Sequence, residues 1–406
     1  MQYHDLLNIQ QDVVLDPKEQ LKILEHNSNH LSIGIPKERQ NEEKRVALIP
    51  SAIQTLVQRG HKVFVEKGAG TESHYSDEEY IKNGAFIVYS PDELFNKSKM
   101  IVKVQPPSDE ECNYIQEKQI IFSALNIGTI RKNYFKTLQE KDATCIAYEY
   151  IENLHGELPI VKVLSEITGA LCIQIAARYL ESVNKGRGIL LGGIAGIPAS
   201  TVVILGAGTV GEFAARSALG NGAQVIILDR DVSKLREIES KLDRRVTTAI
   251  SNQYYLNKVV KFADVLIGAI SLRGEKNPYI ITEEMVKTMK PGAVILDISI
   301  DQGGCIETSR PTSFSNPVFI KHNVTHYCVP NISSAVSRTA SNALTNTLTS
   351  YILEIGDHTN INSALWKNLT LRNGTYLYKG FSTKRNLTDL FGIPYRDIEI
   401  LLTEGS

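Results

Sequence analysis

The sequence has few cysteines, and none is placed to hold a zinc ion or a disulfide framework. Its 406 residues include five cysteines, an odd number, and no Cys-x-x-Cys pair occurs among them. Zinc sites and small disulfide-rich domains need closely spaced, paired cysteines, so neither is expected. Scattered single thiols are typical of a reducing compartment. We therefore expect a cytoplasmic protein without a metal site.

The sequence also lacks an excess of charge of either sign and lacks a long apolar run. The formal net charge is −1, so no electrostatic attraction to nucleic acid is expected. No stretch of about 18 consecutive apolar residues occurs. The N-terminus does not combine a basic start with an apolar core, so it does not resemble a secretory signal. We expect neither a nucleic-acid partner nor a membrane partner.

What the sequence does have is apolar residues in alternating strand and helix patterns. Hydrophobic residues make up 42% of the chain, and a chain of this length holds about two domains. Helix patterns separate the strand patterns, which lie at residues 31–35, 62–66, 100–104, 120–125 and 144–151. Such alternation predicts an α/β fold with parallel sheets.

The most informative segment is TVVILGAGTVG, residues 201–211. A strand of β-branched and aliphatic residues leads into Gly206, Gly208 and Gly211, and a helix pattern follows. A second apolar strand then ends at Asp229. This order predicts a dinucleotide-binding βαβ unit. Gly206 permits the tight turn, Gly208 lets the backbone approach a pyrophosphate, and Gly211 lets helix and strand pack closely.

The acid at the end of this unit indicates which dinucleotide is bound. Asp229 lies 18 residues after Gly211, where a carboxylate can accept hydrogen bonds from the adenosine ribose. The same carboxylate repels a 2′-phosphate, although the adjacent Arg230 could bind one. We therefore predict NAD, rather than NADP, as the cofactor.

Two long helix patterns, residues 163–182 and 333–354, enclose the dinucleotide unit. They suggest that the chain leaves its first domain and later returns to it. We predict two Rossmann-like doubly wound domains joined by long helices, the first of them discontinuous. The predicted parts are an N-terminal extension at 1–30, a substrate domain at 31–160 plus 338–406, and an NAD-binding domain at 161–337. The tail from 360 is expected to hold short helices and loops.

Several motifs resemble the alanine dehydrogenases and the NAD-binding subunit of proton-translocating transhydrogenases. They are IGIPKE at 33–38, RVALIP at 45–50, VEKGAG at 65–70, SEITG at 165–169 and DISIDQGGC at 297–305. The resemblance covers roughly residues 31–380. The SEITG and IDQGG motifs are more similar to the alanine dehydrogenase branch. The resemblance implies a homohexamer that uses NAD to interconvert L-alanine with pyruvate and ammonia.

The resemblance also implies roles for individual residues. Arg45 matches the arginine that holds the substrate carboxylate, which a planar guanidinium can bind through both oxygens. Lys103 matches a substrate-binding, catalytic lysine. Asp301 matches the aspartate beside the nicotinamide, which can accept a proton during turnover. Positions that border the cofactor are matched by Ser165, Lys234, Ser251 and Asn331.

The sequence departs from the resembled family at two positions. The family has a catalytic histidine after the lysine strand, and the aligned residue here is Asn126. Asparagine can donate a hydrogen bond to a substrate oxygen, but it cannot exchange a proton near neutral pH. Gln105-Pro106-Pro107 replaces the family's Lys-Glu-Pro and alters the rim of the site. Asn126 is kept as a substrate-binding and catalytic candidate.

Several functions therefore remain open, all with a small-molecule partner. The first is an NAD-dependent L-amino-acid dehydrogenase, most simply alanine dehydrogenase. The second is a dehydrogenase for another 2-oxo acid or amino acid. The third is a regulatory homologue that binds NAD(H) with weak or no turnover. A transhydrogenase subunit is the last, and it would need a membrane partner chain.

Overall fold

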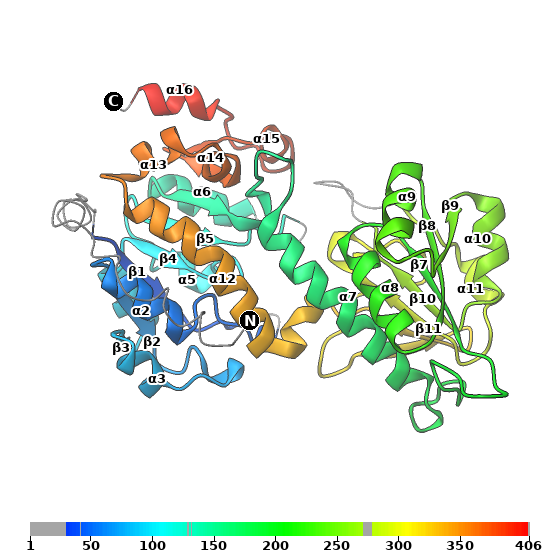
Figure 1. Cartoon of the computed structure of the whole chain (residues 1–406). Helices are drawn as coiled ribbons and strands as arrows, with labels where there is room; N and C mark the ends of the chain where they lie inside the picture. The colour runs from blue at the N-terminus through cyan, green and yellow to red at the C-terminus, as the bar shows by residue number, and fades with distance from the viewer. Residues whose placement is uncertain (1–29, 41, 128–129, 131, 271–277, 405–406) are drawn as a thin grey trace, which may run out of the picture.

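The computed structural model describes residues 30–404 apart from 41, 128–129, 131 and 271–277. It shows two α/β lobes, each built around one sheet (Figure 1). This confirms the predicted fold class of two Rossmann-like domains. Except for His30, the predicted N-terminal extension at residues 1–30 lies outside the described residues.

The first lobe contains an eight-stranded sheet in its described part, in the order β15-β14-β6-β5-β4-β1-β2-β3. The strands β1 to β6 are parallel. Their bounds are β1 (Ser32–Ile35), β2 (Lys62–Glu66), β3 (Phe86–Val88), β4 (Met100–Val102), β5 (Ile120–Ser123) and β6 (Thr144–Ala147). The intervening helices are α2 (Pro50–Gln58), α3 (Asp77–Lys82), α4 (Pro91–Lys97), α5 (Asp109–Cys112) and α6 (Lys132–Glu140). The strand order reverses between β1 and β4, which makes this the position where open α/β sheets bind ligands.

The second lobe repeats this plan with seven strands in its described part, in the order β12-β13-β11-β10-β7-β8-β9. Six strands are parallel, and β12 is an antiparallel edge strand. Their bounds are β7 (Thr201–Leu205), β8 (Gln224–Asp229), β9 (Thr247–Ile250), β10 (Val265–Gly268), β11 (Val294–Asp297), β12 (Val318–Lys321) and β13 (Val324–Tyr327). The helices are α8 (Thr209–Gly220), α9 (Val232–Lys241), α10 (Gln253–Val260) and α11 (Glu283–Lys287). This is the strand order of dinucleotide-binding domains.

The C-terminal tail returns to the first lobe and adds two strands that the sequence analysis missed. The strands β14 (Thr375–Tyr378) and β15 (Phe381–Ser382) pair antiparallel, and β14 continues the sheet beside β6. All four residues of β14 are buried. Helices accompany them, namely α13 (Ile361–Lys367), α14 (Leu369–Gly374), α15 (Arg385–Phe391) and α16 (Ile398–Thr403). The expectation of short helices and loops alone was therefore wrong for this segment.

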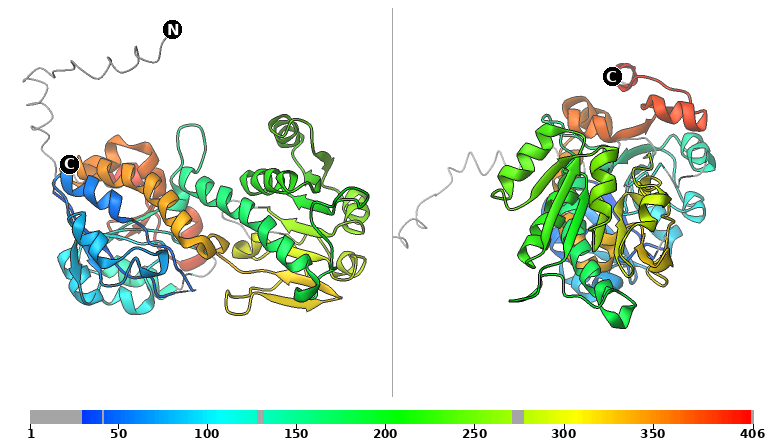
Figure 2. Two further views of the ribbon diagram at one scale, coloured as in Figure 1. Left: turned by 60° about the horizontal axis from the view of Figure 1, so that its bottom comes forward. Right: turned by 90° about the vertical axis from the view of Figure 1, so that its right-hand side faces the viewer.

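Two long helices connect the lobes (Figures 1 and 2). The helix α7 (Pro159–Leu180) runs from the first lobe to the second, where it packs against α8. The helix α12 (Ser337–Gly356) leads back and packs against α7 and α2. The predicted start of α12 at residue 333 falls instead in the short 3₁₀ helix η5 (Ile332–Val336). This return path makes the first domain discontinuous.

The helix α7 is long and apolar enough to cross a membrane, judged by length and composition alone. The sequence analysis expected no such segment. In the structure, α7 packs against α8, α12 and β11. Several of its side chains are buried there, including Leu171, Cys172 and Ile173. These contacts place α7 between the two lobes, which it joins.

The crossing of α7 and α8 depends on Gly169. A Cβ atom added at Gly169 would lie 2.5 Å from the carbonyl oxygen of Val210 and 2.8 Å from the backbone nitrogen of Ala214. Because both atoms belong to the backbone of α8, the helices would have to separate. We expect Gly169→Ala to lower the free energy of unfolding by about 1–3 kcal/mol. Denaturant unfolding would measure this loss.

Gly220→Ala is the matched control, because it makes the same change at the other end of α8. A Cβ atom at Gly220 would meet nothing within 4 Å. Alanine also has the higher helix propensity, so this variant should be as stable as the wild type or slightly more stable. Equal stability of the two variants would contradict the role given to Gly169.

Candidate functional site

The predicted site residues lie just past the carboxyl ends of the parallel strands. In the first lobe, Lys103 follows β4 and Asn126 comes three residues after β5. In the second lobe, Gly206 follows β7, Asp229 ends β8, and Asp301 comes four residues after β11. Parallel strands present their carboxyl ends at one edge of a sheet, so each lobe gathers its candidate residues at one edge.

Arg45 lies in a buried cluster that joins distant parts of the chain. Its Nε and Nη2 atoms donate to the two carboxylate oxygens of Glu43, both at 2.7 Å. Its Nη1 donates to the Ser333 hydroxyl at 3.0 Å, and Nη2 also donates to Asn331 Oδ1. Four of the five guanidinium N–H groups thus have partners among the described residues. Arg45 is 3% exposed.

Glu43 is the centre of this cluster. Besides Arg45, its carboxylate accepts hydrogen bonds from Gln105 Nε2 at 2.8 Å, from Ser334 Oγ at 3.1 Å and from Asn331 Nδ2. Burial alone would raise the pKa of Glu43, but the charge of Arg45 and these hydrogen bonds lower it to about 2. Burial likewise opposes the charge of Arg45, but Glu43 outweighs it and raises the pKa of Arg45. The pair is therefore ionised at every working pH.

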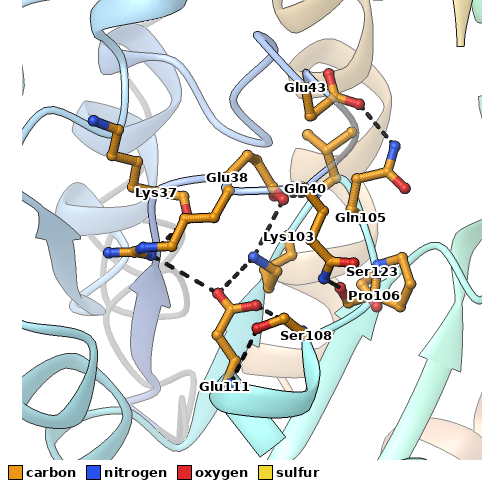
Figure 3. A network of polar contacts seen from close by, with 12 residues as sticks. Lys37, Glu38, Gln40, Glu43, Lys103, Gln105, Pro106, Ser108, Glu111 and Ser123 are labelled. Atoms are coloured by element: carbon orange, nitrogen blue, oxygen red, sulfur yellow. Dashed lines mark hydrogen bonds and ion pairs between the residues drawn. The ribbon is translucent and has the colours of Figure 1, made fainter. Parts of the chain in front are cut away.

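Gln105 connects this ion pair to Asn126. Its Nε2 donates to Glu43, as Figure 3 shows, and its Oε1 accepts from Asn126 Nδ2 at 2.7 Å. The backbone N–H of Asn126 donates to Glu149 Oε1 at 2.9 Å. The sequence analysis placed Gln105 only on the rim and did not single out Glu43. The available signal for Gln105 as a site residue was its position, a polar glutamine directly after an apolar strand.

Lys103 lies in a second buried cluster, shown in Figure 3. Its Nζ is 2.9 Å from Glu111 Oε1 and 3.2 Å from Glu38 Oε2, and Lys103 is 1% exposed. Within the described residues, the hydrogen bonds and ion pairs of the Lys103 ammonium group go to these carboxylates, and none reaches Gln105 or Asn126. Burial raises the pKa of Glu38 to about 7, although the charge of Lys103 opposes this shift. The structure thus separates Lys103 from the Arg45 cluster.

Asp301 belongs to the second lobe but lies within electrostatic reach of Arg45. It sits in the 3₁₀ helix η4 (Ile298–Gln302), which follows β11. Asp301 is exposed to solvent on one side. The protein packed around it raises its pKa to about 6 by desolvation, against the opposing effects of the Asn331 N–H and of Arg45. Asp301, Asn331 and Arg45 therefore form one group drawn from both lobes.

The glycine-rich turn has the geometry that its sequence predicts. Gly206 has φ +108°, and a Cβ atom there would lie 2.4 Å from the Ala269 carbonyl oxygen. A Cβ atom at Gly211 would lie 2.0 Å from the Gly206 carbonyl oxygen. At Gly208, which caps α8, an added Cβ atom would meet nothing within 4 Å. The backbone before α8 is therefore open at Gly208, the position where a phosphate would approach.

The other candidates for cofactor binding lie in different surroundings. Asp229 accepts hydrogen bonds from the backbone N–H groups of Ala207 at 2.7 Å and Asp231 at 2.9 Å. Ser251 directly follows β9, and its N–H donates to the Asp229 carbonyl at 2.8 Å. Lys234 is exposed on α9, and Ser165 is partly buried on α7. Among the described residues, no group of three or more His, Cys, Asp or Glu could hold a metal ion.

The structure is that of a two-domain protein of the dinucleotide-binding class. It has two doubly wound lobes, a glycine-rich turn before α8 and an arginine–carboxylate cluster beside the second lobe. The family described as "Alanine dehydrogenase/PNT" matches residues 34–168 with its N-terminal domain and 172–385 with its C-terminal domain. The chain belongs to this family.

Individual relatives agree with this assignment. An alanine dehydrogenase of Methanococcus maripaludis is 42% identical over 92% of this chain and 100% of its own length. A solved L-alanine dehydrogenase is 37% identical, with a TM-score of 0.85 over 89% of this chain and 99% of that one. A transhydrogenase structure from Sinorhizobium meliloti is 21% identical, with a TM-score of 0.74 over 86% of this chain and 98% of that one. The last likeness shows the fold alone.

The Lys103 cluster generates a prediction about stability. Lys103→Met leaves Glu38 buried without its cation and leaves Glu111 with Arg39, whose Nη1 is 4.0 Å away. This loss costs about 3–5 kcal/mol at pH 8. The pKa of both carboxyls should rise in this variant, so the folded state binds protons more tightly than the unfolded chain. Its stability should therefore fall as the pH rises from about 5 to 8. Urea unfolding of variant and wild type at both pH values would measure the difference.

Lys97→Met serves as the control, because Lys97 pairs with Glu93 at 2.6 Å but is half exposed. An exposed pair of this kind contributes about 0.2–1 kcal/mol. A loss for Lys103→Met that is as small as this, or that is equal at both pH values, would count against the buried pairing.

Proposed function

We propose that this protein is an NAD-dependent L-alanine dehydrogenase, which converts L-alanine, NAD⁺ and water to pyruvate, ammonium, NADH and a proton. The placement of Arg45 and Asp301 carries the proposal, because these residues come from different lobes and belong to one electrostatic group. Relatives named alanine dehydrogenase match the chain over nine-tenths of its length, which supports the same activity. We further propose the predicted domain division, a cytoplasmic location and assembly as a homohexamer, the last of which the resemblance implies.

NAD fits the residues of the second lobe. The open backbone at Gly208 and the N-terminus of α8 would hold the pyrophosphate. Asp229 would accept hydrogen bonds from the adenosine ribose, with Ser251 next to it. Lys234, Ser165 and Asn331 are proposed to border the cofactor elsewhere. When bound there, NAD⁺ would supply the acceptor for the hydride of the substrate carbon.

Arg45 is proposed to bind the substrate carboxylate, with one rearrangement. One Nη1 N–H has no partner among the described residues, and one Nη2 N–H is held by Asn331 Oδ1. If the Asn331 side chain turns aside, Nη1 and Nη2 can each donate to one carboxylate oxygen. Glu43 keeps the opposite side of the guanidinium in place. Such paired, charge-assisted hydrogen bonds fix the orientation of the substrate.

Asp301 is proposed to accept the protons that the reaction releases. Because desolvation raises its pKa to about 6, it is ionised at neutral pH yet remains basic enough to take a proton. Asn126 is proposed to orient the reacting amino or carbonyl group by hydrogen bonding. Lys103, which its two carboxylates neutralise, is proposed to hold the segment before Gln105 rather than to touch substrate.

A second candidate function is favoured by the amide side chains of Gln105 and Asn126. The resembled family has a lysine and a histidine at these positions, and amides cannot replace their charge or their proton exchange. A dehydrogenase for another amino acid, or an NAD(H)-binding regulator with little turnover, would suit this change.

The proposed reaction leads to a prediction about pH. The kcat/KM for L-alanine should rise as the pH passes through about 6, where Asp301 loses its proton. Asp301→Asn removes this base and should lower kcat/KM by about 10²–10⁴. Absorbance of NADH, recorded with L-alanine and a panel of other L-amino acids, would measure both effects.

Asp397→Asn is a suitable control, since Asp397 is an exposed cap of α16 in the first lobe. A wild type that binds NADH but oxidises none of the amino acids would favour the regulatory function. Asp301→Asn activity within tenfold of the wild type would exclude Asp301 as the base.

The cofactor site leads to a separate prediction. Gly208→Val adds a side chain into open space at an extended backbone position, so the fold should be kept. The same side chain would occupy the space that a pyrophosphate needs, and the Kd for NADH should rise at least tenfold, roughly 1.4 kcal/mol. Fluorescence titration with NADH and thermal unfolding would test this, with Gly220→Ala as control. Unchanged NADH affinity in Gly208→Val would place the phosphates elsewhere.

A further inference from the structure

The hydrogen bonds around Gln105 have a fixed direction. Arg45 can only donate, and its partner Glu43 is held ionised and can only accept. The end of Gln105 that meets Glu43, at 2.8 Å, must therefore be its NH₂ group. This leaves the oxygen of Gln105 at the other end of the amide.

The orientation of the Gln105 amide also fixes the orientation of the Asn126 amide. The oxygen of Gln105 needs a donor, and Asn126 Nδ2 supplies it at 2.7 Å. A reversed Asn126 amide would bring two oxygens together and lose this bond. The backbone of Asn126 is also fixed, because its N–H and that of Leu125 donate to the same oxygen of Glu149, at 2.9 and 2.7 Å. Thus a buried ion pair determines how an exposed amide is oriented.

We propose that Gln105 is a positioning residue, which sets the orientation of the Asn126 amide relative to Arg45 through its hydrogen bond to Glu43. This inference rests on the proposed dehydrogenase function. Gln105 suits the task because a primary amide carries a donor at one end and an acceptor at the other. A lysine there could donate to Glu43 but could not accept from Asn126. Gln105 and Asn126 therefore act as one unit that replaces two ionisable side chains.

The charged groups around Gln105 come from several segments. Glu43 and Arg45 lie in the loop after β1. Glu38 accepts from the N–H of Val104 at 2.7 Å, and Lys103 pairs with Glu38. On the side of β6, Tyr148 donates to the Val104 carbonyl at 2.6 Å and Glu149 holds the backbone of Asn126. Of these groups, Glu43 is the one that forms a hydrogen bond with the Gln105 side chain. A carboxyl group introduced at position 105 would therefore lie next to the Glu43 carboxylate.

The pH dependence of Gln105→Glu tests the direction of the hydrogen bonds that Gln105 makes with Glu43 and Asn126. A protonated carboxyl can donate to Glu43 and accept from Asn126, as the amide does. An ionised carboxyl cannot donate, and the negative charge of Glu43 repels it, so its pKa should be raised. We expect kcat/KM near the wild-type value at pH 6 and at least tenfold below it at pH 9. The activity is measured as the reductive amination of pyruvate. Dividing the kcat/KM of the variant by that of the wild type at each pH removes the effect of ammonium ionisation, which is the same for both proteins.

Gln105→Met and Gln119→Met are the companion variants. Gln105→Met keeps the length of the side chain but removes both hydrogen bonds. We therefore expect its kcat/KM to fall at least tenfold, to the same extent at every pH. Gln119 is another buried glutamine of the first lobe, which donates to the carbonyls of Phe95 and Ser98 at 2.8 and 2.7 Å. Gln119→Met should lower the melting temperature without changing KM or the pH profile. It therefore measures what a merely structural glutamine contributes.

The outcomes separate the two proposals. The positioning role would be overturned if the variants of Gln105 had the KM and the pH profile of the wild type and differed from it only in a lower melting temperature. Equilibrium binding of pyruvate to the NADH complex provides the same comparison without turnover. A wild type that binds pyruvate but does not reduce it would overturn the dehydrogenase function. A pH-dependent loss of pyruvate binding in Gln105→Glu would still support the role of Gln105.

Discussion

The arrangement of the site depends on one buried ion pair, Glu43 with Arg45. Burying either charge alone would cost several kcal/mol, so the pair is tolerated only because its hydrogen bonds are met. Glu43 accepts from Arg45, Gln105, Asn331 and Ser334, which come from three separate segments of the chain. To satisfy this carboxylate, the loop after β1, the end of β4 and the segment before α12 must meet. The pair thereby fixes the first lobe against the start of α12, the helix that follows the second lobe.

The two buried cations at the edge of the first sheet have different surroundings. Lys103 pairs with two carboxylates, those of Glu38 and Glu111. Within the described part of the chain, Arg45 forms one ion pair, with Glu43, and its side chain also donates to the neutral side chains of Ser333 and Asn331. Because Gln105 and Asn126 carry no titratable group, proton transfer in the proposed reaction falls to Asp301. The proposed reaction therefore separates orientation, which the amides would provide, from acid–base chemistry.

Much of the fold could be predicted from the sequence, because its signals are local. The βαβ unit was predicted from contiguous residues, and short runs of apolar residues marked the parallel strands. The strands β14 and β15 were missed because strands of four and two residues are too short to leave a periodic signal. The different surroundings of Lys103 and Gln105 could not be predicted either. Both follow β4, and only the positions of Glu38, Glu111 and Glu43 show which carboxylates each side chain meets.

The sequence by itself determined the glycine-rich turn, the acid at the end of β8 and the class of fold. These features depend on backbone conformation and on contacts between residues close in sequence. The cluster around Arg45 was decided only by the tertiary structure. Arg45 and Ser333 lie 288 residues apart, and their hydrogen bond exists because α7 and α12 bring both ends of the second lobe back to the first. No local pattern specifies such a contact, since it follows from how two sheets and two helices pack.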